Sequence, residues 1–278
     1  MTENLRVAIV TGAAGGIGRP MTRALLAAGI RVAGVDRDRE PLEALAASAR
    51  EQGKGPNCSP SKPIFPRTLR PRRSPEPPAI GSAALTSWST MPASVRVQFD
   101  LIVGNGRSSS GRSLPISGAA SSQLHTTAPL ALTNAVVPEM MRQGWGRIVN
   151  VTTSLGTMIN PGFPTYGPSK AALEALSAIM AKDLDGTGVT VNVLVPGGIT
   201  NTPMVSESGF DRAQMIQPEV MAPPLLWLVS DAAGKVTGRR FLGVHWDPEL
   251  PPEQAAEKAG APVAWTSIAT MPITPSRS

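Results

Sequence analysis

Short apolar runs alternate with stretches of helical periodicity in two parts of the chain, residues 5–52 and 126–244. Each run is bounded by turn residues, which is typical of a strand buried in a sheet. The predicted strands cover residues 5–10, 30–35, 146–151, 189–195 and 240–244. The predicted helices cover residues 19–28, 40–52, 129–143, 166–184 and 218–231. At 278 residues the chain is long enough to bury a full core, and one α/β domain of that size is ordinary.

Between these two parts, residues 53–124 lack regular periodicity except at 95–103, where VRVQFDLIV predicts a strand. Eight prolines lie within residues 56–78, with Arg and Ser between them, and residues 104–122 are rich in Gly, Ser and Arg. Because proline lacks a backbone N–H group and blocks helix interiors, we expect no packed element at 56–78. We interpret 53–124 as an insertion or a corrupted segment within a domain spanning 1–246. The following tail, 247–278, has few helix or strand signals.

The net charge of +6 belongs to the same middle segment. Residues 53–124 contain nine Lys or Arg and two acidic residues, whereas the rest of the chain is nearly neutral. A basic arm of this kind is one way to bind nucleic acid or an acidic partner. Proteins that bind single strands interleave aromatic residues for base stacking, and this segment has only Phe65, Trp88 and Phe99. We therefore expect no nucleic-acid partner, and a nucleic-acid-binding arm is the rival hypothesis.

The sequence contains no membrane, secretory or metal-site signal. It has no run of about 18 apolar residues, and its first four residues lack the basic start of a signal peptide. With Cys58 as the single cysteine, an internal disulfide is excluded, and no Cys/His cluster exists for a metal. We expect a soluble, cytoplasmic protein without a metal and without a membrane partner.

A glycine-rich turn, TGAAGGIG at residues 11–18, joins the first predicted strand to the first predicted helix. Glycines permit a tight turn and a close approach of the backbone to a ligand, and the helix N-terminus offers free N–H groups to a pyrophosphate. Asp36 ends the second predicted strand, where a carboxylate can accept hydrogen bonds from adenosine ribose and repel a 2′-phosphate. The nearby Arg37 and Arg39 keep NADP open as the less favoured cofactor.

Tyr166 and Lys170 open the predicted helix at 166–184 and are four residues apart. They therefore lie on the same helix face, one turn from each other. A neighbouring ammonium group stabilises a phenolate and lowers the pKa of a tyrosine, which suits the phenol to exchanging a proton with an alcohol or carbonyl. The strand at 146–151 is followed by hydroxyl side chains that could hold a substrate oxygen.

In this order and spacing, the motifs resemble those of the short-chain dehydrogenase/reductase family. The resemblance rests on TGAAGGIG, Asp36, GRIVNVTTS, YGPSK and PGGITNTPM, and it covers residues 5–52 and about 126–244. It implies a single Rossmann-like α/β domain, in which a doubly wound parallel sheet has helices on both faces. It also implies a homodimer or homotetramer acting on a small-molecule alcohol or carbonyl substrate with NAD. The alternative is a degenerate member that is inactive or only binds cofactor.

The resemblance assigns roles to individual residues. Tyr166 is similar to the family's acid/base, and Lys170 to the residue that lowers its pKa and holds the nicotinamide ribose. The family's active-site hydroxyl, 13 residues before the tyrosine, falls on Thr153, with Ser154 beside it, and the choice between them stays open. Positions similar to the family's cofactor-binding residues are Gly12, Gly15, Gly16, Ile17, Gly18, Asp36, Asn105, Tyr166, Lys170, Pro196, Gly197, Ile199 and Thr202.

Departures from the family pattern lie at or near the middle segment. The family's Asn-Asn-Ala-Gly motif is absent, and residues 100–106, DLIVGNG, retain only Asn105. His125 stands where the family has a fourth catalytic residue, an asparagine; a proton-relay role is possible, but the pattern breaks at that point and we do not count it as catalytic. We expect His245 to be a packed or surface residue. The regions 204–217 and 247–278 have no signature that identifies a substrate.

Overall fold

The computed structural model describes residues 6–36, 38–51, 95–99, 121–205 and 209–265. Its strands form one seven-stranded sheet in the order β2-β1-β3-β4-β5-β6-β7. Strands β1 to β6 pair in parallel, and β7 forms an antiparallel edge next to β6. The strands are β1 (Val7–Thr11), β2 (Arg31–Val35), β3 (Val95–Phe99), β4 (Gly146–Val151), β5 (Val189–Val195), β6 (Arg239–Leu242) and β7 (Gly260–Pro262).

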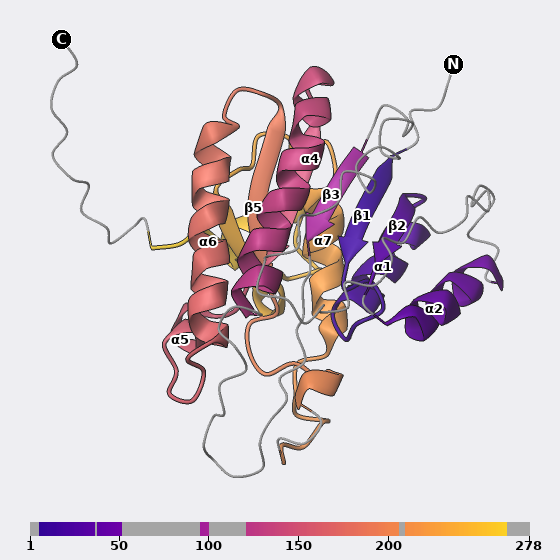
Figure 1. Cartoon of the computed structure of the whole chain (residues 1–278), viewed down its shortest axis with the longest axis vertical. Coiled ribbons are helices and arrows are strands. Elements are labelled where there is room, and N and C mark those ends of the chain that lie inside the picture. The colour runs from indigo at the N-terminus through magenta and orange to yellow at the C-terminus, as the bar shows by residue number, and fades with distance from the viewer. Residues whose placement is uncertain (1–5, 37, 52–94, 100–120, 206–208, 266–278) are drawn as a thin grey trace, which may run out of the picture.

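Helices cover both faces of the sheet, so the described part of the chain has three layers (Figure 1). Helices α1 and α7 pack side by side on one face, and α4 and α6 cover the other. The helices are α1 (Gly18–Ala27), α2 (Arg39–Glu51), α4 (Ala128–Arg142), α5 (Leu155–Met158), α6 (Tyr166–Asp183), α7 (Ala222–Leu228) and α8 (Pro252–Ala259). A π-helical turn, η3 (Gln123–Thr127), leads into α4. This confirms the doubly wound α/β fold.

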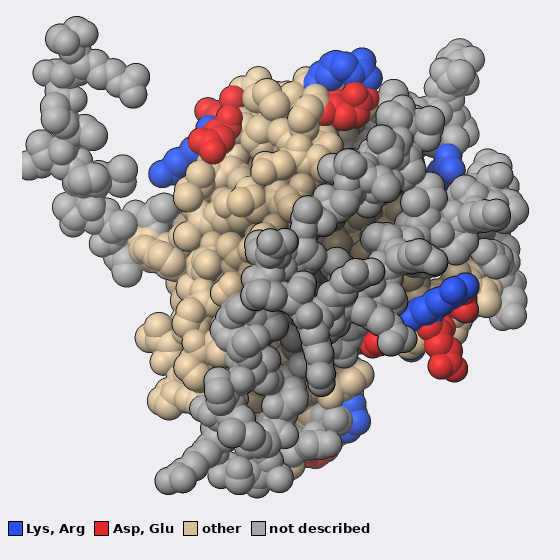
Figure 2. Space-filling view, in the orientation of Figure 1, with Lys and Arg blue, Asp and Glu red and all other residues tan. Residues whose placement is uncertain are grey.

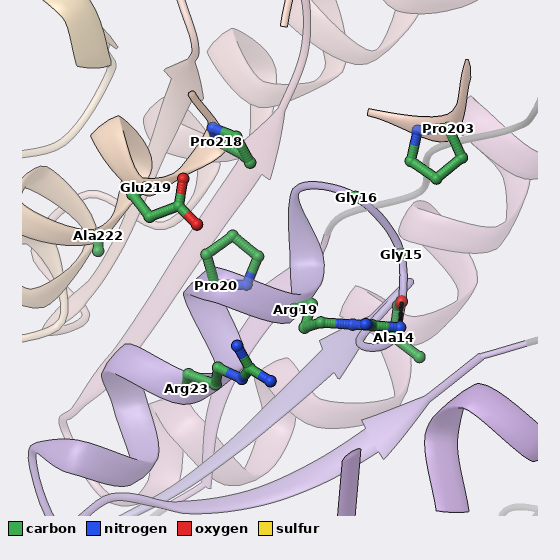
Figure 3. A pocket seen from close by; sticks show the side chains of 10 residues that line it. All are labelled: Ala14, Gly15, Gly16, Arg19, Pro20, Arg23, Pro203, Pro218, Glu219 and Ala222. Atoms are coloured by element: carbon green, nitrogen blue, oxygen red, sulfur yellow. Dashed lines mark hydrogen bonds between the residues drawn. The ribbon is translucent and has the colours of Figure 1, made fainter. Parts of the chain in front are cut away.

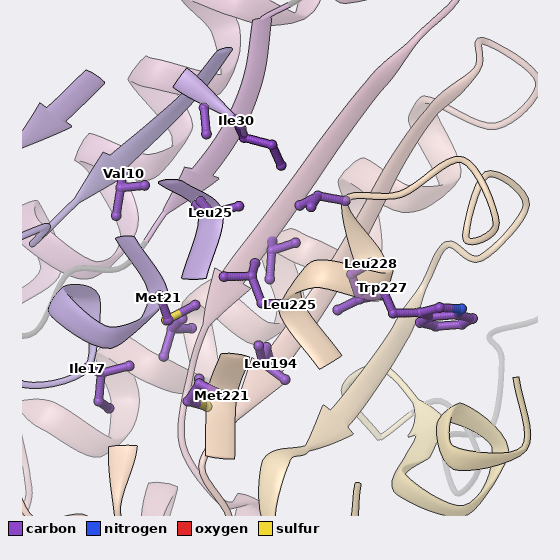
Figure 4. Packing of buried hydrophobic residues seen from close by; sticks show 14 of the residues in the cluster. Val10, Ile17, Met21, Leu25, Ile30, Leu194, Met221, Leu225, Trp227 and Leu228 are labelled. Carbon is purple, nitrogen blue, oxygen red and sulfur yellow. The ribbon is translucent and has the colours of Figure 1, made fainter. Parts of the chain in front are cut away.

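Two hydrophobic clusters hold the layers together, and the strands divide their side chains between them. In β1, Ala8 and Val10 belong to the cluster under α1 and α7, whereas Ile9 belongs to the cluster under α4 and α6. In β4, Val149 and Ile148 face opposite sides in the same way. Alternation follows from the two-residue repeat of a strand, and a strand buried on both faces therefore reads as a continuous apolar run. Figure 4 shows side chains of the first cluster packed between α1 and α7.

The elements predicted from periodicity are present with their ends shifted by a few residues. The predicted helix at 218–231 is an exception, because it is divided into a short 3-10 turn, η5 (Pro218–Met221), and helix α7. Two prolines follow Ala222 at the start of α7. Proline has no N–H group to donate to a preceding turn, so it favours a new helix start at this point.

The predicted strand at 95–103 is confirmed over its described part, β3, which lies between β1 and β4 near the middle of the sheet. Residues 52–94 and 100–120 lie outside the described residues. The chain therefore passes through the middle of the sheet within the segment 53–124 that we interpreted as an insertion or a corrupted segment.

Residues 247–278 have few helix or strand signals, yet their first part contains regular structure. Helix α8 and strand β7 form there, and β7 pairs with β6. The buried side of α8 consists of Ala255, Ala256 and Ala259. Three alanines give only a weak apolar periodicity, which explains why the sequence does not predict this helix. Their small side chains nevertheless let α8 pack closely against the rest of the domain.

Candidate functional site

The glycine turn between β1 and α1 is compact, and two of its glycines could not be replaced by larger residues without strain or a clash. Gly12 has a positive φ of 66°, and a Cβ atom on Gly18 would clash with the Gly12 carbonyl oxygen. The Gly15 N–H donates to the same oxygen at 2.9 Å. Helix α1 begins directly after this turn, and Ile17 at its N-cap makes no side-chain capping bond. Within α1, Arg19 donates its N–H to the Gly15 carbonyl at 3.0 Å and Pro20 has no N–H group, so the N–H groups that could meet an anionic ligand here are those of Gly16, Ile17 and Gly18.

A cavity of about 410 Å³ lies beside this turn (Figure 3). Its lining includes Gly15, Gly16 and, from the first turns of α1, Arg19 and Arg23, with Glu219 of η5 facing them. The Arg19 guanidinium donates to the Ala14 carbonyl at 3.2 Å. Two guanidinium groups next to a helix N-terminus create a positive environment suited to phosphate groups.

The loop after β5 contacts the glycine turn, and its Pro203 lines the cavity. Gly197 has a φ of 113° and lies against Val244, and Pro196 precedes it. Thr202 is buried against Gly16, so that a Cβ on Gly16 would lie 2.5 Å from the Thr202 Cβ. Ile199, in contrast, is exposed. The loop at the carboxyl end of β5 thus contacts the glycine turn at the carboxyl end of β1, the edge where open α/β sheets bind ligands.

Asp36 lies just beyond β2 and reaches back to the glycine turn. Its Oδ2 accepts the Ala14 N–H at 2.9 Å, and its Oδ1 accepts the Asp38 N–H at 3.3 Å. Arg39 is engaged elsewhere, with its Nε 2.6 Å from Oε1 of Glu43, one turn along α2. Arg37 lies outside the described residues. Among the described groups, a carboxylate therefore occupies the position next to the glycine turn.

Tyr166 and Lys170 begin helix α6, as their spacing predicts. Lys170 is 2% exposed, and its Nζ donates to the Val151 carbonyl at 2.9 Å. The same Nζ lies 6.0 Å from the centre of the Tyr166 ring. Since Val151 ends β4, the ammonium group joins the face of α6 that carries Tyr166 to the strand after which Thr153 and Ser154 follow.

Thr153 and Ser154 are both half-buried and follow β4 directly. Ser154 is the N-cap of the short helix α5, with a ψ of 140°, and makes no side-chain capping bond. The carbonyl oxygen of Thr153 accepts a hydrogen bond from Nη2 of Arg240 at 3.0 Å. Neither hydroxyl is singled out by these contacts, so both stay candidates.

His125, which we did not count as catalytic, lies beside Tyr166. The two rings meet edge to face, with centroids 5.7 Å apart and an interplanar angle of 87°. His125 is buried in η3, and its Nδ1 lies 2.8 Å from Oγ of Ser169, which donates to the Tyr166 carbonyl at 2.8 Å. With the serine hydroxyl donating to the carbonyl, Nδ1–H of His125 is the donor to Oγ. The spacing of residue 125 before β4 matches the position of the family's fourth catalytic residue, but the family has an asparagine there.

The remaining expectations fall outside the site or the described residues. Asn105 lies in a segment that the structure does not describe. His245 is exposed in the 3-10 turn η6 (Gly243–His245), as expected. Within the described ranges, no group of three or more His, Cys, Asp or Glu could hold a metal ion. A search of the same ranges finds no helix long and apolar enough to cross a membrane.

Comparisons with known proteins agree with this geometry. A family model described as short chain dehydrogenase matches residues 6–58 and 119–213. A nodulation protein G of Rhizobium sp. (strain N33) is 30% identical over 249 residues, which cover 84% of this chain and 93% of that protein. The NADPH-dependent aldehyde reductase 2 of Arabidopsis thaliana is 29% identical over 271 residues, covering 85% and 92%.

Solved structures have the same fold. A short chain dehydrogenase/reductase family oxidoreductase from Burkholderia thailandensis superposes with a TM-score of 0.65 at 25% identity, covering 86% of this chain and 90% of that one. A putative short chain dehydrogenase of Escherichia coli CFT073, complexed with NADPH, has a TM-score of 0.70 at 23% identity, covering 87% and 99%. The family model and the relatives, together with the glycine turn and the Tyr166–Lys170 pair, establish that this chain belongs to the short-chain dehydrogenase/reductase family of oxidoreductases.

Proposed function

We propose that the chain interconverts an alcohol and a carbonyl compound, with a nicotinamide dinucleotide as hydride carrier. The observation that carries this proposal is the Tyr166–Lys170 pair on α6, with buried Lys170 bonded to the end of β4. Thr153 and Ser154 follow that strand end directly. A tunable phenol, an ammonium group and a hydroxyl donor are the three groups that proton transfer to a carbonyl oxygen requires.

The residues around the glycine turn fit a dinucleotide. Gly12 has a positive φ, a side chain at Gly18 would clash with the Gly12 carbonyl, and the adjoining cavity exposes Arg19 and Arg23 beside a helix N-terminus. Gly15, Gly16, Ile17 and Gly18 would approach the pyrophosphate through their backbone. The cofactor supplies or accepts the hydride, and the protein supplies position and electrostatics.

Each side chain has one role in the proposed reaction. In the reducing direction, the Tyr166 phenol donates a proton to the carbonyl oxygen, and in the oxidising direction its phenolate removes the alcohol proton. Lys170 stabilises the phenolate form. The hydroxyl of Thr153 or Ser154 donates to the same substrate oxygen and offsets the negative charge that develops there.

For the cofactor, Asp36 favours NAD because a carboxylate next to the glycine turn repels a 2′-phosphate. Several similar proteins are named for NADPH, among them the Arabidopsis reductase and the Escherichia coli CFT073 structure. Both cofactors therefore belong in any assay. The substrate class is an alcohol or carbonyl compound; aldehyde reductases and 3-oxoacyl-(acyl-carrier-protein) reductases are among the relatives.

The proposed partner, besides substrate, is a second copy of the chain. Leu130 and Met141 are exposed on α4, and Ile179 is exposed on α6. Figure 2 shows charged side chains at the upper ends of α4 and α6 and at the right and lower edges of the visible face, while the tan surface over the middle of α6 is uncharged. An uncharged helical face with exposed apolar side chains is suited to a symmetric dimer.

The substitution Tyr166→Phe tests the proposed function. We expect the variant to fold and to bind cofactor like the wild type, because the ring is retained, and its kcat to fall by about 10²–10⁴. Turnover is measured with NADH and NADPH against a panel of aldehydes and ketones, and cofactor affinity by fluorescence titration. Retained turnover would remove Tyr166 from the mechanism. A wild type that binds cofactor but reduces no carbonyl compound would favour a degenerate family member.

A further inference from the structure

A buried carboxylate on α6 connects three separate parts of the chain. Glu174 is 0% exposed and lies one helical turn beyond Lys170. Its Oε2 accepts a hydrogen bond from the Thr152 hydroxyl at 2.6 Å, and its Oε1 accepts the Ala264 N–H at 3.0 Å. The same Oε1 forms an ion pair with Nε of Arg240 at 3.1 Å. Glu174 thus joins β4, β6 and the segment that follows β7.

Arg240 extends this connection to the residue next to the candidate hydroxyls. Its side chain is 8% exposed, and besides pairing with Glu174 it donates from Nη2 to the Thr153 carbonyl at 3.0 Å. Since the guanidinium is planar and rigid, one group fixes the distance between its two partners. The Thr153 carbonyl is therefore held relative to the carboxylate of Glu174.

Three successive residues at the end of β4 are each held by a different buried charged side chain. The three bonds run from Lys170 to Val151, from Thr152 to Glu174 and from Arg240 to Thr153. The bond from Lys170 belongs to the pair already described. The other two have no place in the chemistry proposed above, although they hold Thr152 and Thr153, the two residues before Ser154.

The C-terminal segment completes the cluster. Strand β7 pairs with β6 opposite Arg240, and Val263 packs with Val193 and Val195 of β5. Ala264 then turns its N–H toward Glu174 and adopts a positive φ of 58°, which is unusual for a residue other than glycine. A conformation of this kind persists when its surroundings hold it, and here the bond to a buried carboxylate does so.

We propose that Glu174, Arg240 and the Ala264 amide act as a positioning cluster for the end of β4. The cluster holds the backbone at Thr153, and thereby keeps the hydroxyl of Thr153 or Ser154 in place against the substrate oxygen. This inference rests on the proposed oxidoreductase function, because the role it gives these residues is to hold a hydroxyl of that same site in position. A displacement of about 1 Å in a catalytic group is enough to cost about 100-fold in rate.

A role in stability alone would be the simpler explanation, but the energetics of buried pairs argue against it. Replacing a buried ion pair by neutral residues of similar size is often neutral or stabilising. The double substitution Glu174→Gln/Arg240→Met uses this property. Gln retains an acceptor for Ala264 and a partner for the Thr152 hydroxyl, and Met replaces the stem of the arginine, so that no charge is stranded. The hydrogen bond from Arg240 to the Thr153 carbonyl is lost in this variant.

The experiment compares the double variant with the wild type as purified full-length chains. We expect an unchanged unfolding midpoint, a cofactor dissociation constant within about twofold of the wild type, and a kcat lower by about 10- to 100-fold with little change in KM. Hydrogen exchange of a peptide covering residues 150–158 should be at least about tenfold faster. The control is Asp247→Asn/Lys258→Met, which removes an exposed ion pair and should change neither kcat nor the exchange of that peptide.

A second pair of variants tests the hydrogen bond from the Ala264 N–H and leaves both Glu174 and Arg240 in place. Ala264→Pro removes the N–H that reaches Glu174 and excludes the positive φ, whereas Ala264→Gly keeps the N–H and suits that φ. We expect Ala264→Pro to reduce kcat at least about fivefold and to speed exchange at 150–158, and Ala264→Gly to match the wild type.

The outcomes separate this inference from the proposed function. If the wild type turns over and both the double variant and Ala264→Pro match it in kcat and in exchange, the positioning cluster is refuted and the function stands. If the wild type has no turnover, the proposed function fails, and the exchange of residues 150–158 still decides whether the cluster holds β4. Loss of kcat that merely follows a lowered unfolding midpoint in both variants would also overturn the inference.

Discussion

At position 36 we expect a single carboxylate to decide between two cofactors that differ by one phosphate. Asp36 lies 2.9 Å from the Ala14 N–H of the glycine turn, close to where an adenosine ribose would lie. Removing the charge while keeping a hydrogen-bonding group should make room for a 2′-phosphate. We expect Asp36→Ser to strengthen NADPH binding at least about tenfold and to weaken NADH binding, as measured by fluorescence titration. A wild type that already binds NADPH more tightly would refute Asp36 as the selector of NAD.

A second prediction at this scale concerns the two hydroxyls after β4. Both Thr153 and Ser154 are half-buried, and only one of them needs to reach the substrate oxygen. Loss of one oxyanion donor costs about 10²–10³ in kcat. We expect one of the variants Thr153→Ala and Ser154→Ala to lose that much and the other to stay within about fivefold of the wild type. Steady-state kinetics decide between them, and near-normal rates for both variants would exclude a hydroxyl from the mechanism.

The residue scale also shows which parts of the site a sequence can reveal. Lys170 follows from Tyr166 by the helical repeat alone, because residues four apart share a face whatever the rest of the fold does. Glu174 and Arg240 are 66 positions apart, and they meet only because β6 lies next to β5 in the sheet. His125 reaches Tyr166 through the same kind of long-range arrangement. Spacing predicts local pairs, and the order of the strands determines the others.

At the scale of elements, the contact between α5 and α6 sets where Tyr166 begins its helix. A Cβ on Gly167 would clash with the Met158 carbonyl at the end of α5, so Gly167→Ala must push the two helices apart. We expect it to lower the free energy of unfolding by about 1–3 kcal/mol and also to reduce kcat. Chemical denaturation and kinetics measure the two effects. Gly156→Ala in α5 is the matched control, since its Cβ would meet nothing within 4 Å. Equal stability of the two variants would contradict the prediction.

The elements differ in how well the sequence predicts them, and the type of side chain that each one buries explains the difference. Strands β1 and β5 are buried along their whole length; β1 is apolar up to its last residue, Thr11, and β5 is a valine-rich run interrupted by Thr190 and Asn192. Helix α8 has only alanines on its buried side, and its Lys258 contacts Asp247 in the preceding loop at 3.0 Å. The hydrogen bond from Lys258 lowers the pKa of Asp247 below its usual value. Such a contact depends on the folded loop around Asp247 and leaves no periodic pattern in the sequence.

At the scale of the whole molecule, the described part of the chain leaves apolar side chains exposed on the face formed by α4 and α6. On α4, Leu130 and Met141 are 11 residues apart and therefore lie on one side of the helix. On α6, Ala172 and Ile179 are exposed seven residues apart. The helix between Ala171 and Ala181 contains one charged residue, and that residue, Glu174, is buried. Both sides of α6 are thus apolar, which is typical of a helix covered on both sides.

A symmetric dimer through this face would place each Ile179 near its counterpart, because a twofold interface repeats the same patch on both subunits. Ile179→Glu would then bring two carboxylates into a desolvated interface, where like charges cost several kcal/mol. We expect its dimer dissociation constant to rise at least about 100-fold, as measured by sedimentation equilibrium and light scattering. Ile159→Glu is the control: Ile159 is 86% exposed but lies after α5, away from α4 and the middle of α6, so the dimer should persist. A wild type that stays monomeric at micromolar concentration, or an Ile179→Glu variant as dimeric as the wild type, would rule out this face as the interface.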